Sequence, residues 1–176
     1  AINVGYGQIK VGQSYLESGK DDALKFNLDA AKVKFQLAGK NFEQANGQLN
    51  VLKNSFLSKA PIVGEQIDLV MKTVDSAQRV SAVMFDLTNM GQKMMIAGVG
   101  IKNFGELSRE NKVAFLALLE SFSGDLAETD DNMQVALQEF ENFQQNSWLA
   151  TIFVNDKIGY EIYLLSDITG KLRVAS

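Results

Sequence analysis

The chain has 176 residues, 46% of them hydrophobic, a formal net charge of −4 at pH 7, and neither cysteine nor histidine. The length and hydrophobic content indicate one folded domain, residues 1–176, and the mild acidity argues against a nucleic-acid-binding protein. The two missing residue types exclude cysteine nucleophiles, histidine-dependent triads, zinc fingers and disulfide frameworks.

The N-terminal stretch, residues 2–18, has apolar residues at helical steps, although three glycines within it weaken the expectation of a helix. Gly19 is typical of a helix end, and the acidic pair Asp21 and Asp22 is typical of a helix start. We therefore expect a first, shorter helix to end near Ser18 and a long helix to begin at the acidic pair.

Residues 28–56 carry the clearest pattern in the chain. Apolar residues recur there at unbroken steps of three and four: Leu28, Ala31, Phe35, Ala38, Phe42, Ala45, Leu49, Leu52 and Phe56. This spacing predicts one long helix with a narrow apolar seam. Bulky and small residues alternate along the seam, so a neighbouring helix is expected to approach closely at the alanines. Either the rest of the chain or a second copy must cover the seam.

The long helix is expected to end near Leu57, because Pro61 disfavours helix before it and favours a helix start after it. From about Gly64, apolar residues at the same steps predict a third helix, running from Ile67 to Met94. The far end of this helix is rich in methionine. We interpret these methionines as core filler, with a docking surface as the alternative.

Residues 97–105 contain three glycines and form a second break. They match neither glycine-rich phosphate motif, so a helix–helix turn is the preferred interpretation over a phosphate site. Ser108 is predicted to cap a fourth helix, in which residues 121–124 favour a kink, and residues 146–147 are predicted to cap a further one. The tail, residues 158–174, fits either a helix or a hairpin, and we prefer the helix because the preceding elements are helical.

No catalytic, cofactor-binding or metal-binding residue is predicted, and no cofactor. The densest ionisable cluster is an acidic run: Asp125, Glu128, Asp130 and Asp131. Calcium binding is the alternative for this run, but the spacing and central glycine of an EF-hand loop are missing. We therefore interpret the run as a solvated helix face.

Three stretches carry a resemblance to a known family: residues 30–35, residues 42–45 and the break at residues 60–66, Ala-Pro-Ile-Val-Gly-Glu-Gln. They resemble the helical N-terminal region of a bacterial surface-protein family, domain of unknown function 4012, over about residues 20–100. The resemblance implies an envelope protein with an N-terminal membrane anchor, this helical region outside the membrane and a separate C-terminal domain. The family brings no established activity, so the resemblance implies no catalytic residues.

Together these patterns predict an all-α fold, an elongated antiparallel bundle of three long helices with shorter helices at the ends. We expect a non-enzymatic stalk or protein-interaction module at the cell surface, as a fragment of a longer membrane-anchored protein. The expected partner is a protein or a second copy, bound through the helical seams. Nucleic acid is not expected, and membrane contact is expected only through a segment absent from this chain. The alternative is a ligand-sensing helical ectodomain of the chemoreceptor type, ahead of a carboxylate enzyme or a membrane-active protein.

Overall fold

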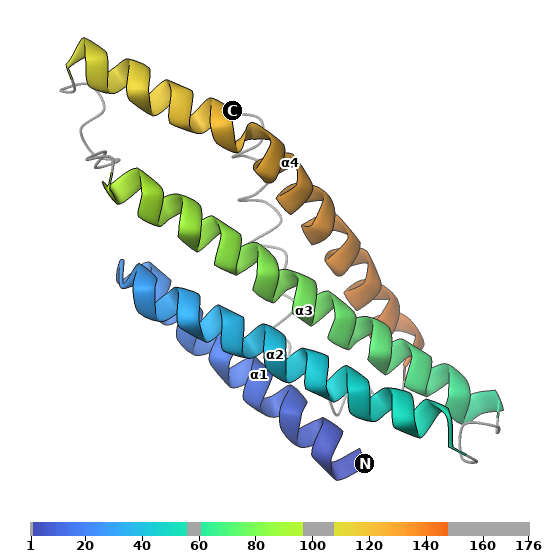
Figure 1. The fold of residues 1–176 in the computed structure, drawn as a ribbon. Coiled ribbons are helices and arrows are strands. Elements are labelled where there is room, and N and C mark those ends of the chain that lie inside the picture. The colour runs from blue at the N-terminus through green and yellow to red at the C-terminus, as the bar shows by residue number, and fades with distance from the viewer. Residues whose placement is uncertain (1, 56–60, 97–107, 148–176) are drawn as a thin grey trace.

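The computed structural model describes residues 2–55, 61–96 and 108–147, which form four α-helices (Figure 1). These are α1 (Ile2–Leu24), α2 (Leu28–Lys53), α3 (Pro61–Ile96) and α4 (Arg109–Asn146). No strand occurs in the described ranges, so the predicted all-α bundle is confirmed. With 36 residues, α3 is about 54 Å long at the usual helical rise.

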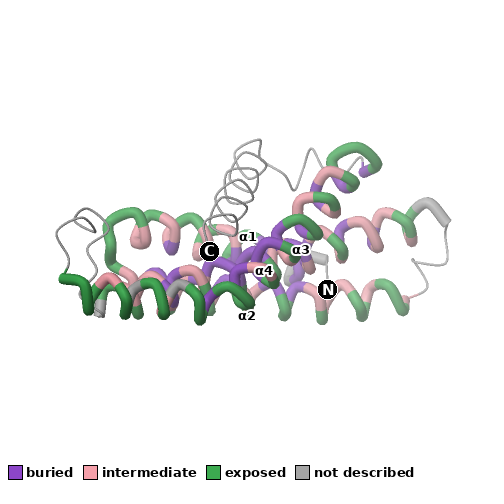
Figure 2. The backbone as a smooth tube through the Cα atoms, turned by 90° about the horizontal axis from the view of Figure 1, so that it is seen from above, coloured by how far each residue is buried: buried purple, intermediate pink, exposed green. Residues whose placement is uncertain are grey.

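The helices are arranged as an array in chain order. α1 packs on α2, α2 on α3 and α3 on α4, whereas α1 touches α3 only slightly. Figure 1 shows neighbouring helices running antiparallel, with α1 and α4 at the two edges. In Figure 2 the buried segments lie where the helices overlap, and the outer faces are exposed. The bundle is therefore elongated, as the sequence predicted.

The core consists of three apolar clusters that follow one another along α3. The first surrounds Val70 and Val74, the second Val80, Val83 and Met84, and the third Met90. The alternating seam of α2 lies inside the first two clusters, where five of its residues are at most 1% exposed: Ala31, Phe35, Ala38, Phe42 and Ala45. The predicted seam is thus confirmed, and it is covered within one chain.

The glycines of α1 provide the room that the phenylalanines of this seam occupy. A Cβ atom built on Gly12 would lie 2.8 Å from Cε1 of Phe42, and one built on Gly19 would lie 2.8 Å from Cε1 of Phe35. Any larger residue would collide with a buried ring. These glycines therefore permit close packing of α1 on α2 rather than ending the first helix.

The predicted boundary between Ser18 and Asp22 is consequently wrong, because α1 continues to Leu24. The chain turns instead at Phe26, whose φ of 60° lies in the left-handed region. The Phe26 amide donates to the Ala23 carbonyl at 3.0 Å and the next amide donates to the Asp22 carbonyl at 2.9 Å. This is the hydrogen-bond pattern of a Schellman cap, in which glycine usually occupies the left-handed position.

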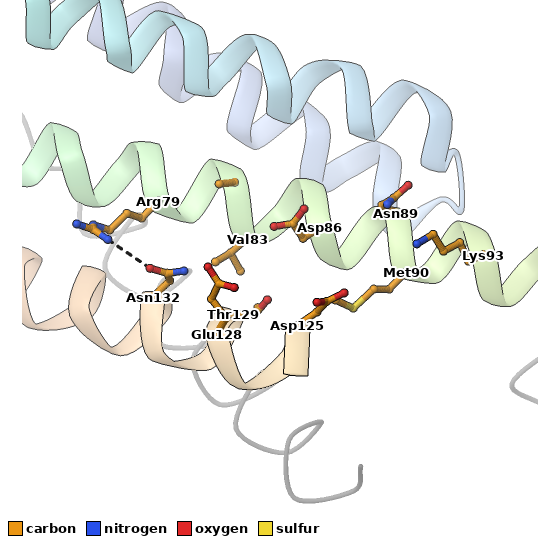
Figure 3. A pocket seen from close by; sticks show the side chains of 11 residues that line it. Arg79, Val83, Asp86, Asn89, Met90, Lys93, Asp125, Glu128, Thr129 and Asn132 are labelled. Carbon is orange, nitrogen blue, oxygen red and sulfur yellow. Dashed lines mark hydrogen bonds between the residues drawn. The ribbon is translucent and has the colours of Figure 1, made fainter. Parts of the chain in front are cut away.

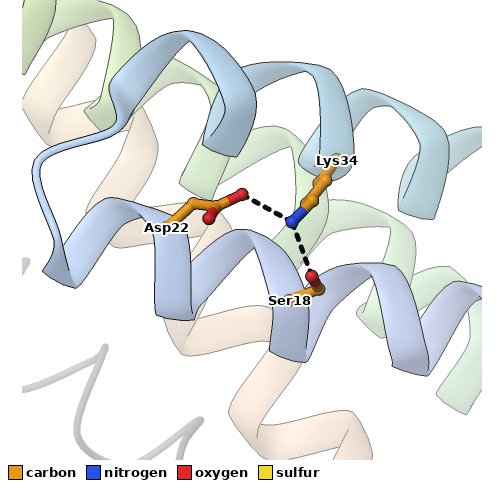
Figure 4. Close-up of polar contacts among 3 residues, drawn as sticks. All are labelled: Ser18, Asp22 and Lys34. Atoms are coloured by element: carbon orange, nitrogen blue, oxygen red, sulfur yellow. Dashed lines mark hydrogen bonds and ion pairs between the residues drawn. The ribbon is translucent and has the colours of Figure 1, made fainter.

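Polar contacts fix the register between neighbouring helices. Lys34 of α2 reaches Asp22 of α1 at 2.5 Å and donates to the Ser18 hydroxyl at 2.6 Å (Figure 4). Between α2 and α3, the Lys53 ammonium lies 2.7 Å from the Asp68 carboxylate. Since an antiparallel pair can slide along an apolar seam, such polar contacts select one register.

The remaining helix ends agree with the sequence only in part. α2 ends at Lys53, before the predicted Leu57, and α3 begins at Pro61. Ser108 caps α4 as predicted, because its hydroxyl accepts from the amide three residues later at 3.2 Å. α4 stays helical through residues 121–124, although Figure 1 shows it changing direction near its middle. Ser147 is the C-cap of α4. The predicted seam residue Phe56, the predictions for residues 97–105 and 158–174, and the predicted helix after residue 147 lie outside the described residues.

Candidate functional site

A groove of about 360 Å³ lies between α3 and α4 (Figure 3). On α3 its lining residues recur at helical steps, with Val83 and Met90 supplying a buried apolar floor. On α4 the buried Thr129 lies beside two exposed acidic side chains and the half-buried amide of Asn132. The helical period therefore places one polar edge of each helix along the same opening.

Three carboxylates line the middle of this groove. Asp86 comes from α3, and Asp125 and Glu128 come from α4. Burial, and then the negative charges of Asp125 and Glu128, raise the pKa of Asp86 above its ordinary value. A cationic group placed here would relieve this repulsion. The chemistry of the groove therefore favours an ammonium-bearing ligand over an anionic one.

A metal centre at these carboxylates finds no support in the part of the chain that the structure describes. Within the described ranges, no three Asp, Glu, His or Cys side chains are placed to hold a metal ion. Calcium at the acidic run would need several oxygen ligands converging on one point. The groove instead offers separated charges along its length.

Cations and amides flank the carboxylates. Arg79 Nη1 donates to Asn132 Oδ1 at 3.3 Å, which ties α3 to α4 at one end of the groove (Figure 3). At the other end, the Lys93 ammonium lies 5.5 Å from the centre of the Phe122 ring. The groove thus has a positive group near each end and negative groups between them.

The structure places the residues of the acidic run in different environments. Asp125 and Glu128 line the groove, and Asp131 is exposed on α4. Asp130 is only 7% exposed, so the prediction of a solvated face is wrong for this residue. The face of α4 that carries Asp130 turns toward the interior, which the spacing of the run did not reveal.

Sequence reasoning missed the α3 side of the groove. Arg79, Asp86 and Lys93 are spaced seven residues apart, which places them on one face of the helix. This charged repeat within an apolar-periodic helix was the signal available. Its partner on α4 was not visible, because no local pattern tells which helix packs there.

A second polar contact between α3 and α4 is partly buried. The Ser76 hydroxyl, in a residue that is 1% exposed, donates to Glu139 Oε2 at 2.6 Å and to the Lys72 carbonyl at 2.9 Å. The serine is enclosed and shares its proton between two acceptors, so the contact joins the helices rather than providing a nucleophile.

Comparisons with protein-family models, with curated proteins and with solved structures find no match to this chain. The resemblance to domain of unknown function 4012 therefore stays a prediction from the residues that carry it. None of the described helices combines enough length with enough hydropathy to cross a membrane.

Proposed function

We propose that this chain is a non-enzymatic helical stalk and protein-interaction module of the cell envelope, belonging to a longer membrane-anchored protein. The observation that carries the proposal is the arrangement of the core, three clusters in succession along helices of up to 38 residues. Such a core holds a rod together along its length while leaving its sides exposed. The envelope location rests on the family resemblance alone.

The register contacts support a spacer role. Lys34 ties α2 to α1, Lys53 ties α2 to α3, and Ser76 ties α3 to α4. A rod whose helices cannot slide past one another keeps its two ends at a fixed separation. Partners, either another protein or a second copy, would bind the edge helices α1 and α4, because the α2 seam is already covered.

Sedimentation velocity over a wide concentration range tests this proposal. We expect an elongated monomer, with a frictional ratio that matches the rod in Figure 1, and unchanged by dilution. A compact particle would contradict the stalk. Turnover of ester or glycoside substrates that is lost with a single substitution in the α3–α4 groove would contradict the absence of enzymatic activity.

The α3–α4 groove favours a second candidate function, ligand sensing. Its separated charges fit a small molecule carrying an ammonium group, such as an amino acid or a polyamine. A thermal-shift screen of these compounds should raise the melting temperature of the parent if the groove binds one of them. The gain should vanish in Glu128→Gln and persist in Glu120→Gln, since Glu120 is exposed on α4 outside the groove. An equal gain in melting temperature in both variants would exclude the groove as the binding site.

A further inference from the structure

The charged side chains of the α3–α4 groove follow one another in a fixed order. On α3, Arg79, Asp86 and Lys93 lie at steps of seven residues, which places successive positions about 10 Å apart along the helix. Asp125 and Glu128 of α4 lie across the groove from the middle of this row (Figure 3). The lining is therefore positive, then negative, then positive along its length.

These five charges are available to a second molecule. All five side chains are exposed, and in the ranges that the structure describes none of them forms an ion pair. Arg79 donates to the neutral amide of Asn132, and the Lys93 ammonium lies over the Phe122 ring. A partner with the opposite order of charges would therefore break no ion pair when it binds.

The Thr129 hydroxyl in the same groove also lacks a partner. Thr73 and Thr88 of α3 each donate to the carbonyl four residues earlier. Thr129 is 4% exposed and lines the groove (Figure 3), yet it makes no hydrogen bond within the described part of the chain. Because a buried hydroxyl without a partner costs free energy, its place in the groove points to a polar atom of a ligand. The neighbouring floor of Val83 and Met90 suits a hydrocarbon chain rather than a hydrated ion.

We propose that the groove docks an extended segment of a partner protein in which a lysine is flanked by acidic residues three positions before and three positions after it. The lysine ammonium lies among the three carboxylates and donates to the Thr129 hydroxyl, and its methylene chain covers Val83 and Met90. An extended segment covers about 10 Å in three residues, so one acidic residue reaches Arg79 and the other reaches Lys93.

The two cations and the open walls of the groove disfavour other ligands. A polyamine would place further ammonium groups beside Arg79 and Lys93, which would repel them. Pockets for small molecules enclose most of the ligand surface, whereas the charged walls of this groove are exposed. A side chain that projects from a larger partner fits such a groove better. The inference rests on the proposed protein-interaction function and adds the chemistry of the partner.

The test is a nuclear magnetic resonance titration of the 176-residue chain with three end-blocked peptides, followed at the amides of Val83 and Thr129. The first peptide is Glu-Ser-Ser-Lys-Ser-Ser-Glu, the second has norleucine in place of lysine, and the third is Lys-Ser-Ser-Lys-Ser-Ser-Lys. The second should bind about tenfold more weakly than the first, because it lacks the ammonium group. The third should also bind about tenfold more weakly. The net charge of −4 by itself favours the third peptide, so the opposite order reports the local arrangement of charges.

Three variants locate the binding site. Glu128→Gln should weaken binding of the first peptide about fivefold and Lys93→Gln about threefold, since each removes one charge from the groove. Glu120→Gln is the matched control and should leave binding unchanged, because Glu120 is exposed on α4 outside the groove. Equal effects of Glu128→Gln and Glu120→Gln would overturn the proposal.

Three results with the parent chain would also overturn it: no shift with the first peptide, equal binding of the norleucine peptide, and tighter binding of the third peptide or of spermidine. The last result would identify a site for free amines instead. These outcomes are separate from the frictional ratio. An elongated monomer that ignores the first peptide would refute the docking and leave the stalk intact, whereas a compact particle would refute the stalk itself.

Discussion

The same substitution should have opposite effects on stability at two glycines of α1. Gly12 faces Phe42, and a Cβ atom added there would lie 2.8 Å from Cε1 and 2.9 Å from Cζ of the ring. Gly7 is exposed, and a Cβ atom added there would meet nothing within 4 Å. Gly7→Ala should therefore gain the full helix-propensity difference, about 1 kcal/mol.

Gly12→Ala gains the same propensity but must displace a ring that is only 1% exposed. Overpacking a filled core costs about 1–3 kcal/mol, so the net effect should be a loss of up to about 2 kcal/mol. Adding Gly19→Ala, which meets Phe35 in the same way, should roughly double the loss, because the two sites are about 10 Å apart along the helix.

Urea unfolding followed by circular dichroism measures these differences from the transition midpoint, provided that the slope stays constant. Gly47→Ala in α2 is a second control, since Gly47 is also exposed with nothing within 4 Å of an added Cβ atom. If Gly12→Ala stabilises the chain as much as Gly7→Ala, then α1 does not pack on the Phe42 ring, and the account of the α1–α2 contact is refuted.

Three further outcomes are expected. Asp86→Asn should make the chain more stable than the parent at pH 7, because a raised pKa means that the charged carboxylate of Asp86 opposes folding. Urea unfolding at several pH values should show that this gain in stability disappears once the pH falls below 3.8, the ordinary pKa of an aspartate side chain. Ser108→Ala should destabilise the start of α4 by about 1 kcal/mol, seen as faster hydrogen exchange at the Asn111 amide. Lys34→Met should cost about 1–3 kcal/mol in urea unfolding by leaving Asp22 without its ammonium partner, and much less in an Asp22→Asn background.

The structure bears out the parts of the sequence analysis that depend on near neighbours in the chain. The apolar seam of α2 could be predicted because residues three and four apart share a helix face. Its alanines, together with Phe35 and Phe42, are buried. Ser108 could be predicted as an N-cap because its hydroxyl accepts a hydrogen bond from an amide only three residues away. Pro61 marked a helix start because its ring fixes φ at a helical value.

The errors have a common origin in contacts between helices. Gly19 was taken as a helix end because glycine is intrinsically poor in helices, yet the ring of Phe35 makes it necessary there. Phe26 was passed over as a turn residue because local rules expect glycine or asparagine in that conformation. Asp86 was not singled out because its acidic neighbours belong to α4, about 40 residues further along the chain.

By itself, the sequence determined that this protein is helical, where α3 and α4 begin and which face of α2 is apolar. These features follow from steric preferences and hydrogen bonds that reach no further than one helical turn. Only the tertiary structure decided which glycine of α1 packs against which phenylalanine ring and which carboxylates share the α3–α4 groove. Those outcomes depend on how the α1–α2, α2–α3 and α3–α4 pairs align, and the alignment minimises the free energy of the whole core rather than of any one segment.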